Sequence, residues 1–143
     1  MPAGVMLERP TTPPLSLVPG AVVAAGLGRV LARITPHRLR EVLEFARRGA
    51  RPATEAEAAR ARNAIIAVSP RCRGQWCLQR AIATALLCRA GGAWPQWCTG
   101  VRTEPFQAHA WVAVDGRPVG EPGSDIGYFQ VMMAVPPLGR DAS

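Results

Sequence analysis

The sequence predicts an α+β fold, with helices in its first part and a small antiparallel sheet after them. Apolar residues recur at helical intervals over most of residues 17–90. Glycine and proline then interrupt the pattern, and the later segments alternate between apolar and polar residues, as strands do. Between two such segments stands Asp115-Gly116, a typical tight hairpin turn. With 143 residues and 48% hydrophobic content, we expect a single core.

The N-terminal part predicts an arm followed by a helix. Residues 1–16 are expected to be irregular, because four of the first 14 are prolines, and residues 17–143 are expected to form one domain. A first helix is predicted over residues 17–34, facing the core or a partner. Its apolar run is too short and too interrupted for a membrane span, which needs about 20 apolar residues, so no membrane contact is expected.

Two further helices are predicted from their starts. Thr35-Pro36 combines a capping residue with proline at the first helical position, and Gly49 is the expected end of that helix. Its predicted buried stripe consists of Leu39, Val42, Leu43 and Ala46. Thr54 and Glu57 form a capping-box pattern that begins a third helix, which should run to about Val68.

A fourth helix is predicted to begin near Trp76 and to end at Gly91-Gly92. One of its sides carries leucine and isoleucine, and another carries alanine and cysteine at helical spacing. Because small residues allow close packing on several faces, we expect this helix to be central.

The remaining segments predict the sheet. Residues 98–102 and 107–114 are strand candidates, and residues 117–121 should return antiparallel after the Asp115-Gly116 turn. Residues 128–135 form a last apolar run that fits either a strand or a helix.

The net charge of +7 comes from arginine, since the chain contains no lysine. The arginines are spread along the chain without the interleaved aromatic residues of a single-strand binding surface. A solvated basic surface is therefore the preferred interpretation, and no nucleic-acid partner is expected.

Cys77 is the cysteine best placed for chemistry. At the start of a helix, unpaired N–H groups and the helix dipole favour thiolate over thiol. Cys88 and Cys98 have no such position, while Cys72 precedes the helix and stays an alternative. The spacings match neither a zinc pattern nor a disulfide scaffold, so we expect no metal, no cofactor and a reducing, cytoplasmic location.

His109 is the expected general base, because the chain has only two histidines and His37 lies in the first turn of an exposed helix. A third group must orient the imidazole. Asp115 and Glu121 compete for this role. A three-residue turn would place Glu121 on the face of His109, whereas a two-residue turn would place it on the other face.

Several stretches between Thr35 and Met132 resemble the leader peptidases of lasso-peptide biosynthesis, which belong to the transglutaminase-like branch of papain-type folds. The resemblance is carried by residues 77–81, 99–102, 105–112 and 114–121. It implies Cys77 as nucleophile, His109 as base and the acid at position 121, where relatives mostly have aspartate and this chain has Glu121. The backbone N–H of Cys77 and the side chain of Gln75 are the expected oxyanion donors.

The resemblance also implies a function and partners. The chain would remove the leader from a ribosomally made precursor, so that a separate cyclase can close the core into a macrolactam. We expect the leader to be recognised by a separate small protein that contacts the N-terminal helices, with the lasso cyclase as a further partner. A transglutaminase-like acyl transferase and a non-catalytic adaptor with the same fold are the alternatives.

Overall fold

The computed structural model describes residues 15–69, 77–103, 106–120 and 129–138. The predicted arm over residues 1–16 lies almost wholly outside these ranges, and Leu15–Leu17 form the short 3-10 helix η1. In the described chain the α-helices are α1 (Val18–Leu31), α2 (Pro36–Ala46), α3 (Glu55–Val68) and α4 (Cys77–Ala90). The strands are β1 (Arg51–Pro52), β2 (Ala93–Trp94), β3 (Gln96–Thr103), β4 (Phe106–Val114), β5 (Arg117–Pro118) and β6 (Gln130–Val135).

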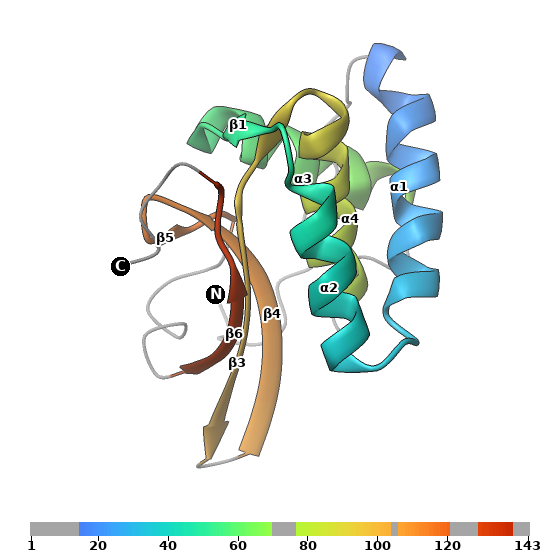
Figure 1. Cartoon of the computed structure of the whole chain (residues 1–143). Coiled ribbons are helices and arrows are strands. Elements are labelled where there is room, and N and C mark those ends of the chain that lie inside the picture. The colour runs from blue at the N-terminus through green and yellow to red at the C-terminus, as the bar shows by residue number, and fades with distance from the viewer. Residues whose placement is uncertain (1–14, 70–76, 104–105, 121–128, 139–143) are drawn as a thin grey trace, which may run out of the picture.

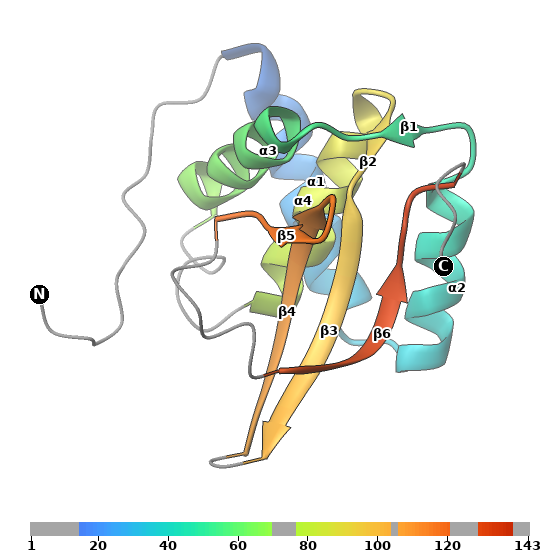
Figure 2. The same ribbon diagram turned by 90° about the vertical axis from the view of Figure 1, so that its left-hand side faces the viewer.

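The main sheet has the strand order β5-β4-β3-β6, and every neighbouring pair in it is antiparallel. The helices gather on one side of this sheet (Figure 1), and Figure 2 shows the sheet in front of α4 and α1. The short strands β1 and β2 pair separately and in parallel. This arrangement confirms the predicted α+β class, with helices first and an antiparallel sheet afterwards.

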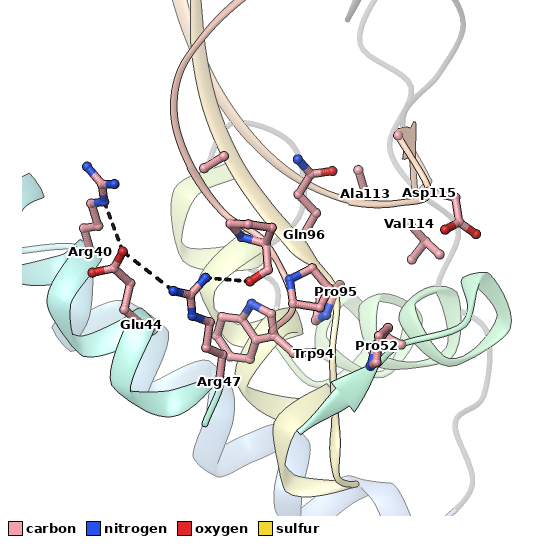
Figure 3. Close-up of a pocket in the computed structure, with 15 residues that line it drawn as sticks. Arg40, Glu44, Arg47, Pro52, Trp94, Pro95, Gln96, Ala113, Val114 and Asp115 are labelled. Carbon is pink, nitrogen blue, oxygen red and sulfur yellow. Dashed lines mark hydrogen bonds and ion pairs between the residues drawn. The ribbon is translucent and has the colours of Figure 1, made fainter. Parts of the chain in front are cut away.

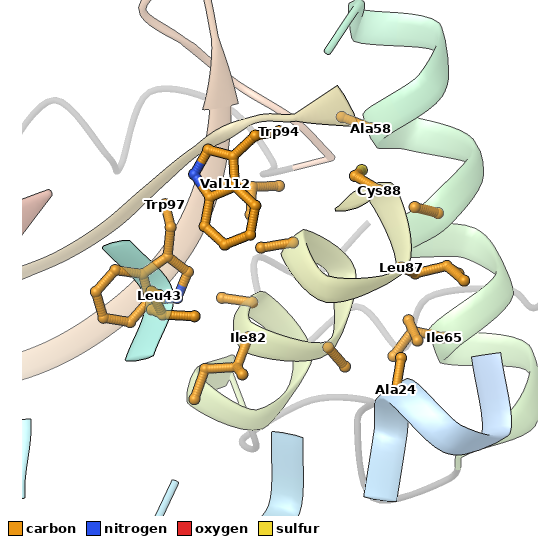
Figure 4. Close-up of a cluster of buried hydrophobic side chains, with 14 of the residues drawn as sticks. Ala24, Leu43, Ala58, Ile65, Ile82, Leu87, Cys88, Trp94, Trp97 and Val112 are labelled. Carbon is orange, nitrogen blue, oxygen red and sulfur yellow. The ribbon is translucent and has the colours of Figure 1, made fainter. Parts of the chain in front are cut away.

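Helix α4 is central, as its alanine-rich composition predicts. It contacts α1 and α3 as well as β2, β3 and β4. Most of its residues are buried, including Ile82 and Thr84, which are fully inaccessible. Ile82 packs in one cluster with Trp94 and Trp97 from the first strands after the helix (Figure 4). The helix that begins with Cys77 is therefore held by packing on several sides.

The helix predicted over residues 17–34 is present, and its small residues pack against the core. The helix ends at Leu31 rather than at residue 34, and its buried residues are Ala21, Ala24 and Gly28, not the larger valines and leucines. Gly28 shows the reason, because a Cβ there would lie 2.7 Å from the backbone oxygen of Gln79 in α4. The two helix backbones approach too closely for a side chain at this point.

We expect Gly28→Ala to destabilise the chain by about 1–3 kcal/mol, because overpacking forces the α4 backbone to shift. Gly26→Ala is the matched control on the same helix, since no atom lies within 4 Å of its added Cβ. That control should stabilise by about 0.5–1 kcal/mol through helix propensity. Urea unfolding of both variants measures the difference, and equal midpoints would contradict the close contact.

The predicted helix starts are confirmed. The Thr35 hydroxyl accepts a hydrogen bond from the Arg38 backbone N–H, and Thr54 and Glu57 form the reciprocal capping box. In α2, Leu39 and Leu43 are buried as predicted, but Val42 is 37% exposed and the helix ends at Ala46, before Gly49. The stripe is therefore narrower than the sequence suggested.

The β4–β5 hairpin has a two-residue turn. Val114 pairs with Arg117 across Asp115-Gly116, and these two turn residues have φ values of 53° and 78°. This is the predicted turn, and it settles the register that the sequence left open. The last apolar run is also settled, since β6 is a strand that pairs with the opposite edge of β3.

Candidate active site

Cys77 is the first residue of α4 and is half-buried. Its backbone N–H belongs to the first turn, whose N–H groups have no partner within the helix. The two other described cysteines differ sharply from it. Burial raises the pKa of Cys88 to about 12, with Glu57 adding to the effect, and burial raises the pKa of Cys98 to about 11. Both are thiols at neutral pH.

The pKa of Cys77 lies below its ordinary value, although burial alone would raise it. A hydrogen bond with the His109 side chain, a hydrogen bond from the Ala110 backbone and the positive charges of His109 and Arg80 outweigh the burial. The structure thus brings the predicted nucleophile and the predicted base into direct contact. A thiolate with a partnered imidazole is the reactive form of a cysteine nucleophile.

The hydrogen bond from Ala110 follows from its place in the sheet. The Val119 backbone N–H donates to the carbonyl of Val112, so the backbone groups of Val112 face the β5 side of β4. Ala110 is two residues away on the same strand and therefore faces the same side. Because β5 extends only to Pro118, the start of α4 can dock there, with its sulfur against the Ala110 N–H.

Aromatic side chains hold the imidazole of His109. Its ring stacks on Trp111 with centroids 5.8 Å apart, and Phe129 approaches to 5.6 Å at an angle of 47°. Trp111 could have been found from the sequence, since residues two apart on a strand share a face. Phe129 could not, because it arrives from a distant part of the chain.

Asp115 is not brought to His109. It stands at the hairpin tip, six residues further along β4, which corresponds to about 20 Å in a strand. It lines a separate cavity of 700 Å³ on the other part of the sheet, where Arg40, Glu44 and Arg47 lie (Figure 3). In that cavity Arg47 donates to the carbonyl of Pro136. Asp115 therefore has a turn role, and the alternative assignment of the acid to it is not supported by the geometry.

Glu121, Gln75 and Cys72 lie outside the described residues, so their expected roles stay predictions. Continued pairing from the two-residue turn would place Glu121 on the face opposite His109. However, Gly120 has a φ of 72°, which interrupts the alternation of the strand before residue 121. A Cβ at Gly120 would lie 2.6 Å from the buried Arg62 side chain. The register of the hairpin therefore does not exclude Glu121.

A cavity of 660 Å³ opens beside Cys77 and His109. This volume is within the range of about 300–1,000 Å³ found for ligand sites. Its wall is largely apolar and comes from the turn after α1, the starts of α2 and α4, and the strands β3, β4 and β6. Cys77 and His109 thus both border an apolar recess that is large enough for part of a ligand.

Within the described ranges, no three side chains of histidine, cysteine, aspartate or glutamate converge as a metal site. Over the same ranges, every helix is too short or too polar to cross a bilayer.

The second histidine, His37, was expected to be solvated. It is exposed, and its ring lies 3.5 Å from the carboxylate of Glu41, one turn further along α2.

A cysteine at a helix N-terminus that is hydrogen-bonded to a histidine on an antiparallel strand is a thiol nucleophile with an adjacent base, here on an α+β fold. The chain belongs to the transglutaminase-like superfamily, whose family model matches residues 21–134. This range includes Cys77, His109 and the whole of β3 and β4. Membership indicates cysteine-protease or acyl-transferase chemistry. No curated protein and no solved structure gives a significant match.

Proposed function

We propose that this chain is a cysteine peptidase that removes the leader from a ribosomally made lasso-peptide precursor. Cleavage would free the N-terminus of the core for macrolactam formation by a separate cyclase. The contact between Cys77 and His109, which lowers the pKa of the thiol, is the observation that carries the enzymatic part of the proposal. The motifs around Cys77, Gly100 and His109 support the narrower assignment to leader removal.

The proposed reaction begins with transfer of the thiol proton from Cys77 to His109. The thiolate attacks the last carbonyl of the leader, and the amine of the core leaves with the proton from His109. Water, activated by His109, then hydrolyses the thioester and restores the thiol. The Cys77 backbone N–H and the Gln75 side chain are the proposed donors to the oxyanion.

Glu121 is the proposed third residue. We expect Glu121→Gln to lower kcat/KM for leader removal by about 100-fold or more, because an uncharged amide stabilises the imidazolium poorly. Asp115→Asn is the matched control, since asparagine tolerates the positive φ of the hairpin turn. It should leave the rate nearly unchanged. A loss with Asp115→Asn and none with Glu121→Gln would reverse the two assignments.

A small leader-recognition protein is the proposed partner, and the outer face of α1 is its proposed contact. This face exposes four large apolar side chains, namely Val22, Val23, Leu27 and Val30. Exposed apolar residues gathered on one helix are typical of interaction surfaces. The proposed assay can therefore be run with and without that protein.

The function is tested by incubating the chain with candidate precursor peptides, translated from short open reading frames next to its gene, and identifying the products by mass spectrometry. Peptidase activity gives a leader with a free carboxylate. Family membership also supports acyl transfer, so a primary amine is added to the reaction. A leader whose last carboxyl group is joined to this amine would show that acyl transfer is preferred over hydrolysis. For a non-catalytic adaptor, iodoacetamide at neutral pH would show no preference for Cys77.

A further inference from the structure

Strand β6 contains a bulge at the site. Thr99 of β3 pairs with Met133, but its neighbour Gly100 pairs with Val131, so Met132 is the extra residue on β6. In a regular strand, consecutive side chains point to opposite faces. A bulge breaks this alternation and can redirect a side chain next to an active site.

The bulge lies in the wall of the cavity beside Cys77. Met132, the extra residue, and Met133 both line this cavity. Opposite the bulge, Gly100 leaves no room for a side chain, since a Cβ would lie 2.7 Å from the Gln130 carbonyl oxygen. Gly100 also pairs with His109 on β4. The bulge, the missing side chain and the base are therefore neighbours across three strands.

The remaining wall has the same apolar character. Ile34 lines it from the turn between α1 and α2, Leu39 from α2 and Leu78 from α4. Among the described lining residues other than the Cys77–His109 pair, Arg40 is the one with a charged side chain. Arg40, Thr99 and the indole N–H of Trp97 offer a few polar groups, but most of the wall would take hydration from a polar group of a substrate without replacing it. An apolar group gains by burial against the same wall.

We propose that this methionine-walled recess is a specificity pocket that selects a large apolar side chain of the peptide next to the scissile bond. The inference rests on the proposed function, in which Cys77 is the nucleophile. Continuity of the recess with Cys77 and His109 fixes its occupant as part of the reacting substrate. Two flexible thioether side chains in the wall adapt to apolar groups of different shape.

Alkylation of Cys77 tests the pocket without a peptide substrate. Second-order rate constants are measured for iodoacetamide and for N-hexyl iodoacetamide by peptide mapping, and each is divided by the rate constant for glutathione. We expect the hexyl reagent to be at least about tenfold faster at Cys77 after this correction, because burial of two methylene groups suffices for that factor.

Met132→Asp is the informative variant, and Val131→Asp is its matched control. Both residues are exposed, at 64% and 51%, so neither change should unfold the chain. Val131 does not belong to the lining of the cavity. The hexyl preference should fall to nearly onefold in Met132→Asp and persist in Val131→Asp.

If the corrected ratio of hexyl reagent to iodoacetamide were near one in the wild-type chain, the specificity-pocket proposal would be wrong. It would also be wrong if both variants lost the hexyl preference equally. Because the ratio compares two reagents at the same sulfur, it does not depend on how reactive Cys77 is. The reactivity itself is read from iodoacetamide alone. If Cys77 were alkylated no faster than Cys88 and Cys98, the proposed function would fail instead.

Discussion

Replacement of Cys77 by alanine is expected to abolish leader removal, with a fall in rate of about 10⁴-fold or more. The variant lacks the atom that forms the thioester, while His109 and the apolar cavity stay in place. Alanine is also a good helix former, so the start of α4 should be retained. The measurement is the appearance of free leader by mass spectrometry under single-turnover conditions.

Cys88→Ala is the control for loss of a sulfur. Burial raises the pKa of Cys88 to about 12, and its side chain lies in the main core, eleven residues further along α4. The control should keep its activity after any small loss of stability is taken into account. Continued cleavage by Cys77→Ala would overturn the nucleophile assignment.

His109→Phe is expected to raise the pKa of Cys77 and to reduce its alkylation at pH 7 by at least about tenfold. The hydrogen bond and charge of His109 oppose the effect of burial on the pKa of Cys77, so without them only the Ala110 N–H and the charge of Arg80 oppose it. Thiolate is the reactive form, and each unit of pKa above the assay pH reduces its fraction about tenfold. The pH at which the alkylation rate of Cys77 reaches half of its maximum should therefore rise.

Phenylalanine was chosen because an aromatic ring at position 109 can keep the packing on Trp111 and Phe129. A merely structural role for His109 would leave the pH profile in place in this variant. Its peptidase activity should be lost together with the general base, by about 10²–10⁴-fold. If His109→Phe kept the same alkylation midpoint and full peptidase activity, His109 would neither lower the pKa of Cys77 nor act as the general base.

The features that the sequence predicted well depend on local interactions. The capping box at Thr54 and the hairpin turn at Asp115 involve residues a few positions apart, and both appear as expected. Cys77 and His109 could be selected because a helix start favours thiolate and the chain has few histidines. Their contact depends on the packing of α4 against β4, which brings the expected nucleophile and the expected base together.

The features that could not be predicted depend on how distant segments meet. The close approach of Gly28 to α4 decides which residues of α1 are buried, and no periodicity in α1 reports it. Likewise, the register shift between β3 and β6 makes Met132 an extra residue in the wall of the cavity. Neither segment alone contains that information, because a bulge is a property of the pair.

The docking of α4 also has a consequence for self-association. The exposed edge of a strand is a template on which other chains can pair and aggregate. At Ala110, the backbone N–H on the free edge of β4 donates a hydrogen bond to the sulfur of Cys77. An incoming strand would have to displace the nucleophile to pair through this position. The thiolate thus protects the sheet against edge-to-edge growth at the very position where it is prepared for reaction.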